Sequence, residues 1–207
     1  SSATTPGKVA SAAPGRFLVC GPDLGGASDS LLSMRGSVGL CMDAVTQPNT
    51  VRGAMDAMYP AWVRASTAFY QGCADHGAGV VFWLGLWSTR PYTTLTCDYN
   101  YMLGPDQFRE VCLGDIQRAC ATFDRSIIHV DGPQAVKHIA TLCELPELDA
   151  IQYTPGAGSP SPLPYVDELR AAQDAGKSLL VMCPANEAIA LAERLKPEGL
   201  ALWLETG

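Results

Sequence analysis

The stretch that decides the fold is RSIIHVDGPQAVKH, residues 125–138. Apolar and β-branched residues lead to His129 and Asp131, after which Gly132 and Pro133 interrupt the strand pattern and a helical pattern begins. A strand that ends in polar side chains and continues into a helix is typical of a βα unit. Because the loops after such strands build functional sites, His129 and Asp131 are the first candidate site residues.

The same alternation continues toward the end of the sequence. Helical patterns and strand-like runs follow one another as PQAVKHIATLCEL, LDAIQYTPG, PYVDELRAAQDAG, SLLVMC, ANEAIALAERL and GLALWLE. Strands that alternate with helices of about 10 to 15 residues predict a parallel sheet with right-handed crossovers. Earlier in the chain we expect amphipathic helices over 49–72 and 104–123, and two further strands at RFLVCG (16–21) and VVFWLGLW (80–87).

Six parallel strands in chain order are therefore expected, with the His129 strand near the middle of the sheet. A complete (β/α)₈ barrel needs eight strands and about 250 residues. The 207-residue chain fits a barrel that is two strands short, or an open α/β sheet. We expect one TIM-barrel-like but incomplete (β/α) domain over residues 16–207, preceded by a flexible N-terminal arm over residues 1–15.

Composition excludes several classes of protein. Fourteen basic against 21 acidic residues give a net charge of −7, and no Lys/Arg cluster is present that would follow a nucleic-acid backbone. No apolar run reaches the roughly 18 to 20 residues that cross a bilayer, and the opening residues lack the apolar core of a secretory signal. The eight cysteines form no C-x-x-C pair, which favours reduced thiols over disulfides. We expect a soluble intracellular protein of the cytoplasm or an organelle.

Four segments stand in a characteristic order: PDLGG, CDYNYMLGPDQF, HVDGPQAVKHIATLCELPELDAIQYTPGAGSPSP and AAQDAGKSLLV. In these segments the sequence resembles the uroporphyrinogen decarboxylase superfamily, and within it the corrinoid methyltransferase-like branch. The resemblance runs from about residue 16 to the last residue and implies a (β/α)₈ barrel. Compared with that family, the chain is expected to be truncated at the N-terminus, where the first strands would lie.

The resemblance also implies a metal site. Corrinoid methyltransferases of this superfamily bind zinc through a His-x-Cys at this strand end and a further Cys after the last strand. In this sequence His129 matches the histidine, Asp131 stands at the cysteine position, and Glu205 lies at the end of the last strand. We expect His129 and Asp131 to be catalytic, and His129, Asp131 and Glu205 to hold zinc or another divalent metal, although carboxylates suit thiol activation less than thiolates do. The alternative is a hydrogen-bonded pair in a pocket without metal.

Six further residues are candidates for binding substrate: Asp23, Trp83, Trp87, Asp98, Tyr99 and Gln152. The resemblance places the turn of Asp23 at the pocket mouth, although an aspartate in such a turn commonly bonds its own backbone. The two tryptophans would wall an apolar pocket or belong to the core.

Two functions remain open from the sequence. The first is a methyltransferase-like or decarboxylase-like enzyme, with metal-assisted methyl transfer on a small substrate or a corrinoid. The second is a non-catalytic structural subunit of a larger assembly, because a truncated barrel leaves strand edges that another chain must cover. That partner would be an N-terminal fragment, a second copy or neighbouring subunits, so we do not expect a free monomer.

Overall fold

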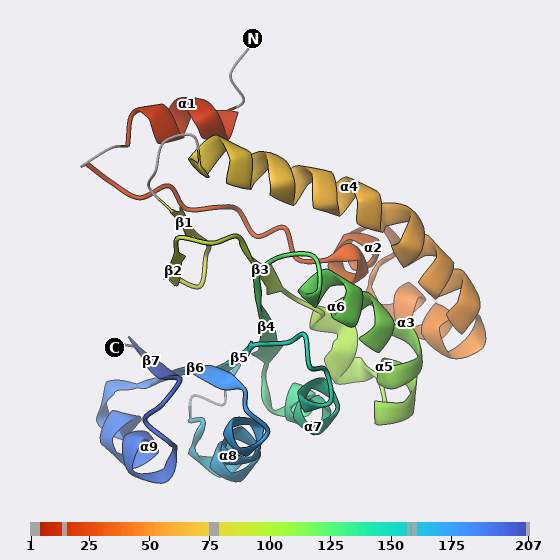
Figure 1. Ribbon diagram of the computed structural model, residues 1–207. Helices are drawn as coiled ribbons and strands as arrows, with labels where there is room; N and C mark the ends of the chain where they lie inside the picture. Colours follow the sequence, from red (N-terminus) through yellow and green to blue (C-terminus); the bar gives the residue numbers. More distant parts are fainter. Residues whose placement is uncertain (1–4, 14–15, 75–78, 157, 159–160, 206–207) are drawn as a thin grey trace.

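The computed structural model describes residues 5–13, 16–74, 79–156, 158 and 161–205. Its centre is a five-stranded parallel sheet in which the strands lie in chain order (Figure 1). The strands are β3 (Tyr92–Leu95), β4 (Arg125–Asp131), β5 (Ala150–Thr154), β6 (Ser178–Pro184) and β7 (Leu200–Glu205). The four strands predicted from residue 125 onward are confirmed, and the fold is α/β with surrounding helices.

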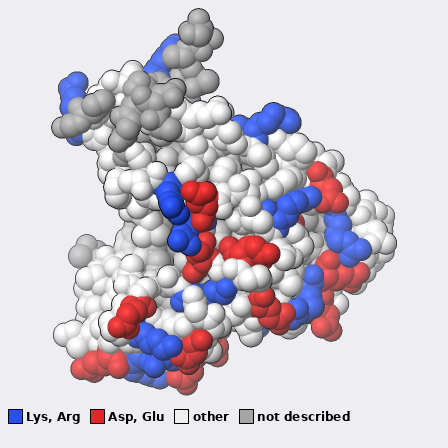
Figure 2. Space-filling model, viewed as in Figure 1, with Lys and Arg blue, Asp and Glu red and all other residues white. Residues whose placement is uncertain are grey.

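Helical segments connect these strands and lie along one side of the curved sheet (Figure 1). They are η1 (Asp98–Met102), α5 (Pro105–Val111), α6 (Leu113–Cys120), η2 (Pro133–His138), α7 (Ile139–Cys143), η3 (Leu163–Tyr165), α8 (Val166–Asp174), η4 (Ala185–Glu187) and α9 (Ala188–Arg194). Acidic and basic side chains are intermixed on the exposed face of this layer rather than gathered by sign (Figure 2). Ion pairs join neighbouring helices there, such as Arg109 with Glu144 at 2.5 Å and Arg194 with Asp167 at 3.3 Å.

The N-terminal part is helical. It consists of α1 (Thr5–Ser11), α2 (Ala27–Arg35), α3 (Ser37–Thr46) and the long α4 (Pro48–Ala74). The helix predicted over 49–72 is confirmed by α4, whose apolar face buries Met55, Trp62 and Phe69. Within the segment expected as a flexible arm, α1 lies against the carboxyl half of α4 and Ala10 is fully buried (Figure 1).

The apolar run VVFWLGLW does not form a strand of the parallel sheet, so that prediction is wrong. It folds into an antiparallel hairpin of β1 (Val80–Val81) and β2 (Trp87–Ser88). Gly85 permits the reversal with a φ of +70°, and its N–H donates to the Phe82 carbonyl at 2.8 Å. The Tyr92 hydroxyl accepts the Phe82 N–H at 3.0 Å and donates to the Leu86 carbonyl at 2.5 Å. These bonds fix the hairpin to β3.

The strand predicted at RFLVCG is also absent from the sheet. Only Cys20 pairs there, through an isolated bridge to Val81. The first strand of the sheet is instead β3, which the sequence left unassigned because its threonines look polar. All four β3 residues are buried, and β-branched threonine suits a strand. The His129 strand is consequently second of five rather than central.

The core has two parts. One lies between the sheet and its helices. The other packs the carboxyl half of α4 and the hairpin against side chains of β3, β4 and β6. All eight cysteines lie in the described residues as free thiols, as predicted, and five of them are buried. In the described part of the chain, no helix combines the length and apolar character needed to cross a membrane.

A candidate active site at the carboxyl edge of the sheet

The parallel register brings polar residues from three neighbouring strands to one edge of the sheet. His129 of β4 lies opposite Gln152 of β5, and Asp131 ends β4. Beyond the end of β3, η1 begins with Asp98. This carboxyl edge is where parallel α/β folds place ligands, so His129 and Asp131 stay candidate site residues.

A cavity of about 310 Å³ opens at this edge. It is formed by the Gly-rich turn before α2, the first two turns of α2, and the residues that follow β3. Its described lining is Asp23, Leu24, Gly25, Asp29, Ser30, Leu32, Ser33, Thr96 and Asp98. Three carboxyl groups and no lysine or arginine are present in this lining, so the cavity favours positive charge and hydrogen-bond donors.

Asp29 is the most strongly perturbed acid of the cavity. Its carboxylate accepts the Asp98 N–H at 2.9 Å and a hydrogen bond from the Thr96 side chain. Burial raises the pKa of Asp29 to about 6, and the negative charges of Asp98 and Asp23 act in the same direction. The two hydrogen bonds oppose this rise. Asp29 therefore titrates close to neutral pH, which is the range in which a carboxyl group exchanges protons with a substrate.

Asp98 connects the cavity with the strand ends. Burial raises its pKa, the charge of His129 opposes the rise, and the charges of Asp131 and Asp23 add to it. These effects require short separations. Asp98 is thus placed between the cavity acids and the His129–Asp131 strand end.

Asp23 both closes its own turn and lines the cavity, the two roles that the sequence left open. Its carboxylate accepts the Gly25 N–H at 2.7 Å, which closes the turn, and the residue also lines the cavity. Gly25 has a φ of +52°, and a Cβ at this position would lie only 2.9 Å from the Thr96 hydroxyl oxygen. Glycine is required for the backbone to approach β3 this closely.

The His129 imidazole is held by a short chain of hydrogen bonds. Its Nδ1 contacts the side-chain oxygen of Gln152, and the Gln152 amide nitrogen donates to the Thr154 hydroxyl at 2.8 Å. With the amide in this orientation, Nδ1 donates to the Gln152 oxygen, so Nε2 is the ring nitrogen that can gain or lose a proton. Gln152 is fully buried. Its side chain therefore supports the imidazole, and its predicted contact with substrate stays a prediction.

Trp83 reaches the same site from the hairpin. Its ring meets the His129 ring edge to face, with centroids 5.2 Å apart and planes at 81°. The indole N–H is buried without a hydrogen-bond partner among the described residues. Trp83 therefore packs beside the imidazole and does not line the Asp29–Asp98 cavity.

Asp131 is exposed where the loops after β4 and β5 meet. The Gly132 N–H donates to the Thr154 carbonyl at 2.8 Å. A Cβ on Gly156 would lie 2.9 Å from the Gly132 Cα and 3.6 Å from an Asp131 carboxylate oxygen. Both glycines have positive φ, 76° and 80°. Together they allow the two loops to approach and leave the Asp131 carboxylate at the mouth of the site.

The structure does not bring Glu205 to His129 and Asp131. Glu205 ends β7, and β5 and β6 lie between β7 and β4. Three strand spacings of about 4.8 Å separate the outer pair by about 14 Å. No three His, Cys, Asp or Glu side chains in the described ranges are grouped so that they could hold a metal. The predicted three-ligand set is therefore not assembled, because the strand order keeps its members apart.

Four predicted substrate residues lie outside the cavity lining. Trp83 and Gln152 contact His129 instead. Tyr99 is buried, and its hydroxyl lies 3.1 Å from the Cys112 sulfur, so it belongs to the core. Trp87 is 55% exposed on β2, and its indole nitrogen would lie 2.7 Å from a Cβ placed on Gly79. Trp87 thus lies on β2 and packs against Gly79, just before β1.

Sequence reasoning missed Asp29 and Thr96. A signal for Asp29 was present, since it follows a Gly-rich turn and stands in the first turn of a helix, where acids are stabilised by the helix dipole. Thr96 extends a strand that the pattern did not reveal. Comparison of the chain with protein-family models gives no match, and comparison with curated proteins gives none either.

Proposed function

We propose that the protein is a uroporphyrinogen decarboxylase-like or methyltransferase-like enzyme that transfers protons to and from a small substrate in the Asp29–Asp98 cavity. The observation that carries this proposal is the paired carboxyl site, in which the pKa of Asp29 is raised to about 6 beside a second acid with a raised pKa. Burial combined with a like charge is how enzymes prepare a carboxyl group for acid–base work.

The lining defines the class of substrate. Asp23, Asp29 and Asp98 line the cavity without a described lysine or arginine. A substrate with a protonated nitrogen, or with several N–H donors such as a pyrrole or an amine, would satisfy these acceptors. A volume of about 310 Å³ lies at the lower end of small-molecule sites. The reacting part of the substrate is therefore small.

A neutral Asp29 serves either reaction. In decarboxylation, the electrons of the broken C–C bond stay on carbon, and the carboxyl proton is transferred to that carbon as carbon dioxide leaves. In demethylation, the electrons of the heteroatom–methyl bond stay on the heteroatom, which takes the proton, while the methyl group passes to a nucleophile such as a corrinoid partner. Asp29 is restored by a proton from solvent, and its burial, together with the charge of Asp98, keeps its pKa high.

His129 has a supporting role in this proposal. Gln152 fixes the ring so that Nε2 is the nitrogen that can gain or lose a proton, and Trp83 limits its movement from the other side. The imidazole can accept a substrate N–H or relay a proton to Asp98.

Zinc does not fit the donor set in this structure. A catalytic zinc takes three protein ligands, and no such group exists among the described residues. We therefore route no step of the proposed reaction through a metal.

The test combines titration and turnover. We expect the Asp29 carboxyl carbon to titrate near pH 6 in NMR spectra of labelled protein. A panel of small pyrrolic acids and methylated amines is then assayed for carbon dioxide release and for loss of methyl groups. Asp29→Asn and Asp98→Asn should each lower turnover by roughly 100-fold or more, the usual contribution of a general acid.

Asp106→Asn is the matched control, because Asp106 is an exposed aspartate in the first turn of α5, outside the cavity. It should retain the parent rate. Turnover of Asp29→Asn at the rate of Asp106→Asn would show that the cavity acid has no catalytic part.

A second function is favoured by the open edge of the sheet. Among the described residues, β7 pairs only with β6, and its apolar side chains Trp203 and Leu204 are 37% and 47% exposed. Strands of parallel sheets are normally covered on both faces, and an open edge accepts a strand from another chain. We propose, as the alternative, that the protein is a structural subunit whose neighbour pairs with β7.

Light scattering at micromolar concentration tests this alternative. A subunit is expected to self-associate or to capture a partner chain, and Leu202→Pro, which interrupts β7, should abolish that association. A stable monomer that melts cooperatively would contradict the structural-subunit function.

A further inference from the structure

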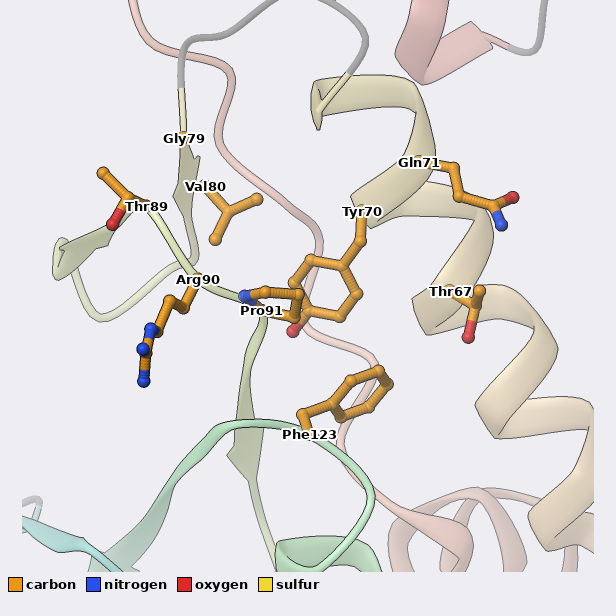
Figure 3. Close-up of a pocket in the computed structure, with 9 residues that line it drawn as sticks. All are labelled: Thr67, Tyr70, Gln71, Gly79, Val80, Thr89, Arg90, Pro91 and Phe123. Carbon is orange, nitrogen blue, oxygen red and sulfur yellow. The ribbon is translucent and has the colours of Figure 1, made fainter.

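A second cavity lies at the amino ends of β3 and β4 (Figure 3). It shares no described lining residue with the Asp29–Asp98 cavity. Its volume is about 440 Å³, within the range of small-molecule sites. The described lining comes from α4, the hairpin, the loop before β3 and the turn between α6 and β4: Thr67, Tyr70, Gln71, Gly79, Val80, Thr89, Arg90, Pro91 and Phe123.

The inner wall is aromatic. The Tyr70 ring projects from α4 toward Pro91 and Phe123 (Figure 3). The Tyr70 and Phe123 ring centroids are 4.8 Å apart with the planes tilted by 56°. Val80 and Pro91 complete the apolar surface, and this surface suits the flat body of an aromatic ring.

A buried polar group in this wall lacks a partner. Tyr70 is only 6% exposed, and its hydroxyl has no hydrogen-bond partner among the described residues. Burial raises the pKa of this hydroxyl, the side chain of Tyr92 adds to the rise, and the Tyr92 backbone N–H opposes it. The hydroxyl therefore remains a neutral O–H donor. A buried donor without an acceptor is costly, and a ligand oxygen would satisfy it.

The rim carries an available positive charge. Arg90 is exposed and forms no ion pair within the described ranges of the chain. Seven other arginines do form ion pairs: Arg35, Arg52, Arg109, Arg118, Arg125, Arg170 and Arg194. No aspartate or glutamate is among the described lining residues. The charge preference is thus opposite to that of the Asp29–Asp98 cavity.

We propose that this cavity binds a small aromatic carboxylate. The ring packs against Tyr70 and Phe123, the carboxylate pairs with the Arg90 guanidinium at the rim, and an oxygen of the ligand accepts the Tyr70 O–H. Guanidinium and carboxylate match as a two-bond pair. This ligand site is separate from the proposed reaction and does not depend on it.

The experiment uses 2-naphthoate as probe and its methyl ester as the neutral counterpart, each titrated into the whole chain. Binding is followed by NMR shifts at Tyr70, Val80 and Phe123. We expect saturable shifts with the acid, and affinity weakened about 5- to 10-fold by Arg90→Gln, the loss typical of a charge-assisted pair. The ester should bind the parent and Arg90→Gln equally. Thr67→Phe, which narrows the cavity from the exposed helix side, should weaken both probes.

Arg194→Gln is the control, since it removes one exposed arginine at the end of α9 without touching the cavity. It should bind 2-naphthoate as the parent does. The proposal is overturned if 2-naphthoate causes no saturable shift at the three residues, or if Arg90→Gln binds it as tightly as Arg194→Gln. Because the Arg90 side chain is exposed, folding of the variant is expected and a melting curve verifies it.

Discussion

At the amino ends of β3 and β4 aromatic side chains pack on one another, whereas at the carboxyl ends of the same strands acids gather around a cavity. Phe82 lies 5.1 Å from both Phe69 and Tyr92, measured between ring centroids. At the other end, Asp29 and Asp98 share a cavity without a described basic residue. The first arrangement stabilises the fold, and the second costs stability, as is common where a site is prepared for chemistry.

The largest effect is expected from Phe82→Ala. Phe82 is 3% exposed and contacts three aromatic rings, so its truncation should lower the free energy of unfolding by about 3–5 kcal/mol. The neighbouring Trp83 faces the site and is partly exposed, so Trp83→Ala should cost clearly less. Urea denaturation of both variants measures the difference. Equal losses of unfolding free energy in the two variants would contradict the idea that the aromatic cluster at the amino ends of the strands stabilises the fold more than the site at their carboxyl ends.

Asp29→Asn should raise the free energy of unfolding, whereas Phe82→Ala lowers it. The pKa of Asp29 is about 6 in the folded protein and 3.8 in the unfolded chain. Between pH 3.8 and pH 6 the folded state therefore keeps the Asp29 proton that the unfolded chain has released. The contribution of Asp29 to stability is complete below pH 3.8 and is lost as the pH rises through 6. At pH 8 the charged carboxylate costs up to about 3 kcal/mol. Asn keeps the acceptor oxygen and removes the charge.

The gain from Asp29→Asn should therefore be about 1–3 kcal/mol at pH 8 and close to zero near pH 4. Chemical denaturation at the two pH values measures it. Asp106→Asn, on the exposed face of α5, should change stability little at either pH. A gain that does not vary with pH would show that the Asp29 charge is not its source.

Gln152→Met tests the support of the imidazole. The substitution keeps the volume of a buried side chain but removes the acceptor for His129 Nδ1 and the donor to Thr154. We expect a loss of about 1–2 kcal/mol in unfolding free energy, the usual cost of unpaired buried polar groups. Nitrogen NMR of the histidine should also show the proton shared between Nδ1 and Nε2 instead of fixed on Nδ1. An unchanged tautomer would contradict the positioning role of Gln152.

The smallest effect is expected from Tyr70→Phe. Its hydroxyl has no described partner, so its removal should leave stability unchanged or raise it by up to about 1 kcal/mol. Tyr92→Phe is the contrast, because the Tyr92 hydroxyl bonds to Phe82 and Leu86, and should cost about 1–2 kcal/mol. Thermal melts distinguish the two. A larger loss for Tyr70→Phe than for Tyr92→Phe would mean that the Tyr70 hydroxyl is already satisfied in the free protein.

Sequence by itself determined the strands from Arg125 onward, the long helix α4 and the polar strand end at His129 and Asp131. Each of these follows from the spacing of apolar and polar residues within a short stretch of sequence, and does not depend on contacts with distant parts of the chain. It also predicted the free thiols, because the cysteines fall within apolar patterns.

Tertiary structure decided what depends on contacts between distant parts of the chain. The raised pKa of Asp29 arises first from its burial in the folded protein and then from the charge of Asp98, 69 positions away in the sequence. The hairpin at Gly85 is held to β3 by the hydrogen bonds of the Tyr92 hydroxyl, which no local pattern in the sequence predicts. Glu205 is kept from His129 by two intervening strands, because strand order is set by the packing of the whole sheet and not by the residues at any one strand end.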